Sequence, residues 1–103
     1  MVEINWTFQS LNDIENISEF ISKDSEKYAK VQAERFFNTV KILDTHPKAG
    51  RTVPEISDRK IRELICGNYR IVYKIVNENL IDILTIHHGN RLLSNNPGID
   101  NDN

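Results

Sequence analysis

Residues 59–91, RKIRELICGNYRIVYKIVNENLIDILTIHHGNR, decide the fold that this sequence predicts. Ile, Val, Leu and Tyr dominate the stretch, and two short polar breaks, Gly67-Asn68 and residues 77–79, interrupt it at strand-length intervals. Apolar, β-branched runs separated by such breaks are typical of strands joined by tight turns. The stretch therefore predicts a meander of three antiparallel strands.

The first turn fixes the register of the first two strands. Gly67 opens a two-residue loop, and a type II′ hairpin needs positive φ at that position, which glycine adopts without strain. The pairs that this turn predicts across the ladder are Cys66 with Tyr69, Leu64 with Ile71, and Arg62 with Tyr73.

Side chains alternate between the two faces of a strand, so the register also assigns faces. One face is predicted to be buried under the rest of the chain, and the other to need no cover. The buried face carries Tyr69, Ile71, Tyr73 and Ile75; the uncovered face carries Arg70, Val72, Lys74 and His88.

The second turn is interpreted as three residues, 77–79, with Asn79 in the left-handed conformation that asparagine tolerates. This choice places Ile75 opposite Ile81 on the buried face. A two-residue turn would instead bring Asp82 into the core, and we reject it for that reason. The three-residue turn leaves Lys74 opposite Asp82 on the outer face.

The first half of the chain predicts a strand and two helices. Residues 2–6 alternate apolar and polar side chains, as a short strand does. Ser10 is the expected N-cap of an amphipathic helix, and residues 22–25 separate it from a second helix that ends at His46-Pro47. We expect α+β architecture: an antiparallel sheet, made of the N-terminal strand and the C-terminal meander, with the helical hairpin packed on one face.

Length and composition predict one domain over residues 1–94, followed by a polar and disordered tail over residues 95–103. No stretch is long and apolar enough to cross a bilayer, and we expect a cytoplasmic protein with no membrane partner. Cys66 is the only cysteine, so an intramolecular disulfide is excluded. We expect no cofactor and no metal, since adjacent His87 and His88 point to opposite faces of their strand.

Charge is placed unevenly along the chain. The net charge is −2, which disfavours a general nucleic-acid binder. Residues 51–74 nevertheless carry 6 basic and 3 acidic side chains, while the segments on either side are net negative. A local basic surface of this kind can attract an anionic partner. Its basic residues are Arg51, Arg59, Lys60, Arg62, Arg70 and Lys74.

The order of strand, helical hairpin, Pro-x-x-Gly-Arg loop and three-stranded meander resembles the RelE/ParE family of bacterial and archaeal toxins. The resemblance covers nearly the whole chain except the tail, and the joint order and spacing of its motifs carry it. The matching segments are Trp6-Thr7 and residues 46–51, 61–64, 69–73 and 83–91.

Within that family the chain looks more like the ParE branch, because of Gly50-Arg51 and the ending at residues 88–91. The resemblance implies the toxin of a type II toxin–antitoxin pair, of the plasmid-stabilisation kind, that poisons DNA gyrase. It also implies a cognate antitoxin and a toxin–antitoxin hetero-oligomer. We expect the antitoxin to bind as an extended or helical segment across exposed apolar and basic surface.

A ribosome-dependent endoribonuclease, as in RelE-like relatives, is the alternative. Such a site needs cations for the phosphate and a group that moves protons. The resemblance implies Arg70, Arg91 and His88 as its catalytic residues, with His87 packed at the end of the sheet. The chain departs from this branch because residues 95–98 lack its C-terminal tyrosine. A third alternative is a toxin fold without toxicity.

Under the gyrase interpretation, the basic residues become target contacts. Arg70 has a structural alternative, an ion pair across the hairpin with Glu63, which lies diagonally beside it on the outer face. Arg51 has another, a hydrogen bond that orders its loop. The predicted target-binding residues are Arg51, Arg59, Lys60, Arg62, Arg70, Lys74 and Arg91.

Overall fold

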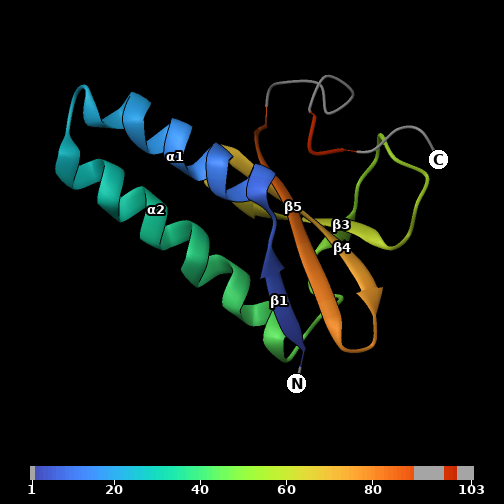
Figure 1. Ribbon diagram of the computed structural model, residues 1–103. Helices are drawn as coiled ribbons and strands as arrows, with labels where there is room; N and C mark the ends of the chain where they lie inside the picture. Colours follow the sequence, from blue (N-terminus) through green and yellow to red (C-terminus); the bar gives the residue numbers. More distant parts are fainter. Residues whose placement is uncertain (1, 90–96, 100–103) are drawn as a thin grey trace.

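A computed structural model describes residues 2–89 and 97–99 of the chain. Two antiparallel helices form one layer and a five-stranded sheet forms the other (Figure 1). This arrangement confirms the predicted α+β class, with the helical hairpin on one face of the sheet. No helix in the described part of the chain has the length and apolarity to cross a membrane.

In chain order the elements are β1 (Glu3–Trp6), α1 (Phe8–Ser22), α2 (Glu26–Val40), a 3₁₀ helix (Lys41–Asp44), β2 (Arg51–Thr52), β3 (Ile61–Cys66), β4 (Tyr69–Asn77) and β5 (Leu80–His88).

The strands lie in the order β1-β5-β4-β3-β2. The predicted meander of β3, β4 and β5 is antiparallel, but β1 pairs with β5 in parallel, so the sheet is mixed. A parallel pair needs a long crossover, and the helical hairpin and meander supply it. The two-residue strand β2 pairs with β3, within the connection between the helical hairpin and the meander.

The hairpin of β3 and β4 has the predicted register in full. Gly67 has φ of 60°, and no other described residue has positive φ, as a type II′ turn requires. Each predicted pair, from Cys66 opposite Tyr69 to Arg62 opposite Tyr73, is present.

The second turn has the predicted pairing but different geometry. Lys74 lies opposite Asp82, and Ile75 lies opposite Ile81. Asn77 pairs with Leu80, so the connection has two residues, and the extra residue sits in β4 as a bulge at Val76. The expected left-handed Asn79 is therefore wrong, as is the rejection of a two-residue turn, because the bulge restores the register.

A second bulge, at Leu84, changes the face on which the end of β5 presents its side chains. Val72 pairs with Thr85 and Tyr73 with Ile83, which leaves Leu84 as the extra residue in β5. Beyond it, His87 lies opposite Arg70 and His88 lies opposite Tyr69. The Tyr69 and His88 rings are 5.5 Å apart, centroid to centroid. The prediction that His88 shares a face with Arg70 is therefore wrong, and His87 takes that place.

The main core lies between the helices and the sheet. Phe36, Leu43, Ile71, Tyr73, Ile81 and Ile83 are fully buried there. The face predicted to stay uncovered is also covered, because a second apolar cluster lies on it. That cluster consists of Val53, Ile61, Val72 and Ile99, with Ile56 and Leu84 packed against it.

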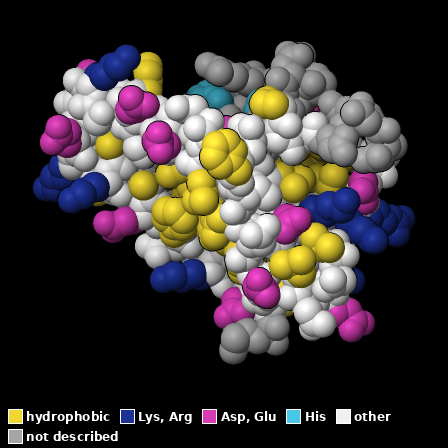
Figure 2. Space-filling model, in the orientation of Figure 1, with side chains coloured by type: hydrophobic (Ala, Val, Ile, Leu, Met, Phe, Trp, Pro, Cys, Tyr) yellow, Lys and Arg dark blue, Asp and Glu magenta, His cyan; other side chains and the backbone are white. Residues whose placement is uncertain are grey.

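The helix hairpin differs from the prediction at its first cap. Thr7, rather than Ser10, caps α1, and its hydroxyl accepts the Ser10 amide and donates to the Ile83 carbonyl. The second helix begins at Ser25 as its cap, within the predicted break. Several large apolar side chains of the two helices are exposed, and Figure 2 shows hydrophobic side chains along the seam between hairpin and sheet. The exposed ones include Leu11, Phe20, Tyr28, Val31 and Phe37.

Candidate functional site

Two clusters of basic residues stand on different parts of the sheet. The first, which we call the arginine–glutamate cluster, consists of Arg51, Arg70, Glu55 and Glu63. Arg70 donates from Nε to Glu63 at 2.5 Å and from both terminal nitrogens to Glu55 at 2.8 and 2.9 Å. Arg51 donates from Nε to the other Glu63 oxygen at 2.5 Å. Two arginines and two glutamates thus neutralise one another.

The strand pairing explains why these four side chains meet. Arg51 of β2 lies directly opposite Glu63 of β3, and Arg70 of β4 lies diagonal to Glu63. The ion pair predicted as the alternative for Arg70 is present, but it is buried rather than on the surface: Arg70 is 8% exposed and Glu63 is 1% exposed. A buried carboxylate needs such partners, because an unpaired charge is costly to desolvate.

Hydrogen bonding within the cluster shifts two pKa values. The bonds from Arg70 hold the pKa of the Glu55 carboxyl below its ordinary value, against a smaller opposing effect of burial. The hydrogen bonds to Glu55, together with the one to Glu63, raise the pKa of Arg70 above its ordinary value. Both carboxylate partners therefore favour the charged form of the arginine.

The lowered pKa of Glu55 predicts an acid-sensitive contribution to stability. A carboxylate with a depressed folded-state pKa stabilises the fold above its ordinary pKa of 4.5, and the contribution is lost as pH falls through the folded-state value. We expect Glu55→Gln to lower Tm at neutral pH and to converge with the wild type in acid. Thermal melts between about pH 6 and pH 2 test this. Glu34→Gln, on the exposed side of α2, is the control, and parallel profiles for Glu55→Gln would contradict the prediction.

A small cavity of about 330 Å³ adjoins the arginine–glutamate cluster at the tip of the first hairpin. Its lining includes Arg51, Arg70, Glu55 and Gly89. It lies where the ribonuclease alternative places its phosphate. The arginines that face it are committed to carboxylates, so the cavity offers no excess positive charge among the described residues.

The second cluster lines an open groove of about 1290 Å³ between the end of the helical hairpin and the sheet. We call it the cationic groove. One side is apolar and the other basic, and Glu78 is the only carboxylate among the described residues that line it. The apolar side is formed by Ile42, Pro47, Ala49, Ile75 and Val76; the basic side is formed by Lys48, Arg59, Lys60 and Arg62.

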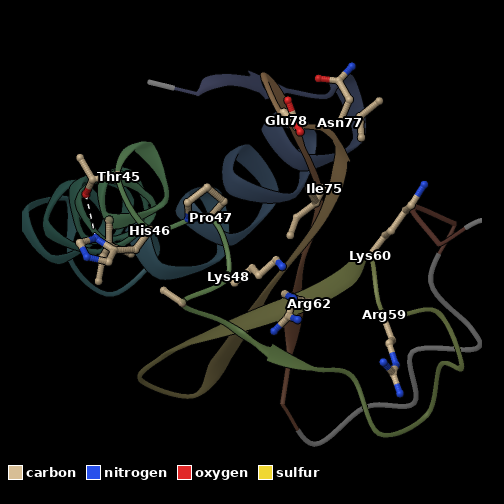
Figure 3. A pocket seen from close by; sticks show the side chains of 13 residues that line it. Thr45, His46, Pro47, Lys48, Arg59, Lys60, Arg62, Ile75, Asn77 and Glu78 are labelled. Atoms are coloured by element: carbon tan, nitrogen blue, oxygen red, sulfur yellow. Dashed lines mark hydrogen bonds between the residues drawn. The ribbon is translucent and has the colours of Figure 1, made fainter.

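Figure 3 shows how these side chains lie. Lys48, from the loop after the hairpin, and Arg62, from β3, point toward the middle of the groove, where Ile75 enters from β4. Lys60 and Arg59 extend away from that middle along the sheet side. The groove therefore has a mixed centre and a basic outer edge.

Tyr73 holds the loop that forms one wall of the groove. Its hydroxyl accepts the Gly50 amide at 2.9 Å and donates to the Pro47 carbonyl at 2.8 Å. Burial raises the pKa of Tyr73, so the hydroxyl keeps the proton that it donates. A Cβ on residue 50 would lie 2.5 Å from the Glu63 carbonyl oxygen, so only glycine lets the loop approach this closely.

Arg62 is half-buried, whereas the other three cations of the groove, Lys48, Arg59 and Lys60, are exposed. It donates from a terminal nitrogen to the Gly50 carbonyl at 2.9 Å. Its Nε is buried and has no hydrogen-bond partner among the described residues, and none of the ion pairs found there includes Arg62. A partly buried guanidinium without a carboxylate attracts an anion that comes from outside.

The predicted site residues thus separate into two places. Arg59, Lys60 and Arg62 line the cationic groove, whereas Arg51 and Arg70 belong to the arginine–glutamate cluster. Lys74 lies half-buried opposite Asp82, and Arg91 lies outside the described residues.

Lys48 was missed by the sequence interpretation. It belongs to a half of the chain that is net negative, so a charge count by segment hid it. Its place in the Pro-x-x-Gly-Arg loop was the available signal. No group of three or more metal-ligating side chains occurs among residues 2–89 and 97–99.

Comparisons with known proteins identify the family to which the chain belongs. Residues 4–93 match the family described as ParE toxin of type II toxin-antitoxin system, parDE. The chain is similar to Toxin RelE2 of Caulobacter vibrioides, with 27% identity over 92 residues that span 89% of this chain and 100% of that protein. It also resembles a solved chain titled chromosomal ParDE TA system from P. aeruginosa, with a TM-score of 0.70 and 20% identity.

The alignment with that solved chain covers 85% of this chain and 96% of the other, and at this identity it shows a shared fold. The family match spans most of the chain, including both basic clusters. The resemblance found in the sequence is confirmed. The chain belongs to the ParE toxin family of type II toxin–antitoxin systems.

Proposed function

We propose that this toxin arrests growth by binding and poisoning DNA gyrase, and that it does not cut messenger RNA. The observation that carries the proposal is the state of Arg70. This arginine, which the ribonuclease alternative needs as a phosphate contact, is 8% exposed and donates to Glu63 and Glu55 from all three guanidinium nitrogens.

Stabilising a pentavalent phosphate requires positive charge that is directed at the reacting oxygens and is not already neutralised. Arg70 would have to release Glu55, and its charge would still be balanced by Glu63, which is fully buried beside it. The acid–base group is also misplaced, because His88 lies beside Tyr69 on the helix-facing side of the sheet. His87, opposite Arg70, is the histidine that an RNA-cleaving version of this site would use.

The cationic groove supports a binding function instead. Arg59, Lys60 and Arg62 carry no ion pair with another described residue, and they lie beside exposed apolar surface. Protein-binding surfaces combine an apolar centre with a polar rim. We assign the target contacts to these three residues, with action in the cytoplasm, where gyrase and the antitoxin are found.

Two assays on the purified toxin test the proposal. We expect inhibition of gyrase supercoiling, or accumulation of cleaved DNA, and no cleavage of messenger RNA in a ribosomal A-site assay. Arg59→Gln together with Lys60→Gln should weaken the gyrase effect, whereas Lys27→Gln with Lys30→Gln, the same charge change on α2, should not.

The opposite pair of results would overturn the proposal. It would consist of messages cut at the ribosomal A-site, with gyrase unaffected. In that case loss of the proton-transfer group in His87→Gln or His88→Gln should slow cleavage by about a hundredfold.

A further inference from the structure

We infer that the cationic groove is the place where the antitoxin docks an acidic, amphipathic segment, which inserts apolar side chains against Ile42 and Ile75 and pairs its carboxylates with Lys48, Lys60 and Arg62. The inference rests on the family's toxin–antitoxin function, and it holds whether or not gyrase is the target. Size, surface chemistry and charge each point to this occupant.

The size of the groove favours a polypeptide. Pockets for small ligands measure roughly 300–1,000 Å³. The cationic groove, at about 1290 Å³ and open along its length, exceeds that range. Grooves of this form accept a helix or an extended segment whose side chains enter at regular intervals.

The chemistry of the walls favours a protein over a nucleic acid. Ile42 is 48% exposed on the 3₁₀ helix, and Pro47, Ile75 and Val76 continue the apolar side across to β4. Single strands of nucleic acid bind on aromatic platforms within a uniformly basic channel. No Phe, Tyr or Trp lines this groove among the described residues. The apolar side of the groove would form no favourable contact with a phosphate backbone.

Charge defines the sign of the partner. Lys48, Lys60 and Arg62 have no carboxylate within ion-pair distance in the described part of the chain, and the Nε of Arg62 is buried without an acceptor. Glu78 lies on the other side of Ile75 from Lys48 and Arg62 in Figure 3, and it would favour a basic residue at one end of the segment. The separation of Glu78 from Lys48 and Arg62 therefore predicts which end of the bound segment is basic and which part is acidic.

The acidic end of this chain is a poor alternative occupant. Residues 100–103 read Asp-Asn-Asp-Asn and contain no apolar side chain. They can supply carboxylates, but they cannot cover Ile42 and Ile75. An amphipathic segment of a partner satisfies both sides of the groove at once.

The test measures binding of the purified, full-length antitoxin encoded beside this toxin, by calorimetry at low and high salt. Lys48→Gln with Lys60→Gln should weaken binding by about tenfold or more at low salt, with less difference at high salt, because screening already reduces the ionic contribution. Ile42→Glu should weaken binding by at least about tenfold at either salt, because it buries an unpaired charge. Lys27→Gln with Lys30→Gln is the charge-matched control and should bind as the wild type does.

Wild-type affinity in both groove variants, with Tm unchanged, would overturn the inference. Equal weakening by the α2 control would also overturn it, because the effect would then come from net charge alone. A wild-type toxin that binds antitoxin through the groove but leaves gyrase unaffected would overturn the proposed target and support the groove assignment. The two proposals therefore fail separately.

Discussion

Replacing Arg70 by alanine is expected to lower the free energy of unfolding by about 3–5 kcal/mol, the usual cost of removing one partner from a buried ion pair. The reason is the carboxylate of Glu63, whose side chain is fully buried between Arg70 and Arg51. Without Arg70 it keeps only the outer, mostly exposed arginine. Urea unfolding of the purified toxin measures the change.

A matched pair of variants separates charge burial from loss of a cation. Arg59→Ala removes an exposed arginine of the same segment and should change the unfolding free energy by less than about 0.5 kcal/mol. Replacing Arg70 by Met and Glu63 by Leu together should recover much of the loss, because no unpaired buried charge remains. Wild-type stability in Arg70→Ala would contradict the prediction, because the buried carboxylate of Glu63 would then not depend on Arg70.

Replacing Gly50 by alanine is expected to destabilise the fold by about 2–3 kcal/mol, toward the upper end for overpacking a tight site. The new methyl group would lie 2.5 Å from the Glu63 carbonyl oxygen and 2.7 Å from the Tyr73 ring, so the loop must move away. That movement breaks the hydrogen bonds from Gly50 to Tyr73 and from Arg62 to Gly50. Binding at the cationic groove should weaken together with stability.

Gly89→Ala provides the comparison, since its nearest contact would be 3.1 Å from the Asn68 carbonyl oxygen. We expect a loss of less than about 1 kcal/mol there, because a small shift relieves that contact. Similar losses at residues 50 and 89 would mean that the loop tolerates the methyl group. The hydroxyl of Tyr73 would then not be the element that positions the groove wall.

Local chemistry was sufficient to predict the first hairpin, because one glycine with positive φ sets every pair between β3 and β4. The bulges at Val76 and Leu84 were not predictable in this way. Each inserts an ordinary apolar residue, and what selects it is the packing of the whole sheet against the helices. The parallel partner of β1 was likewise hidden, since alternation identifies a strand but not its neighbour.

The basic residues were recognised from the sequence, whereas their division into two clusters was not. Arg62 and Arg70 lie on adjacent strands but on opposite faces of the sheet, and Arg70 is neutralised by two glutamates while Arg62 has no ion pair with another described residue. The register places Glu63 on the face of Arg70, and the second partner, Glu55, comes from a loop whose path no local pattern describes. Lys48 reached the groove through the same kind of long-range placement.

The bulge at Leu84 has a consequence for the two adjacent histidines. It shifts the phase of β5 by one residue, so that Ile81 and Ile83 face the helices before it and Ile86 and His88 face them after it. With histidine at two consecutive positions, either phase puts one imidazole on each side of the sheet. A related chain that lacks the extra residue would exchange the two histidines and still present the same pair of surfaces. Because His87 and His88 are adjacent, a one-residue shift of register at this end of β5 still leaves one histidine on each face of the sheet.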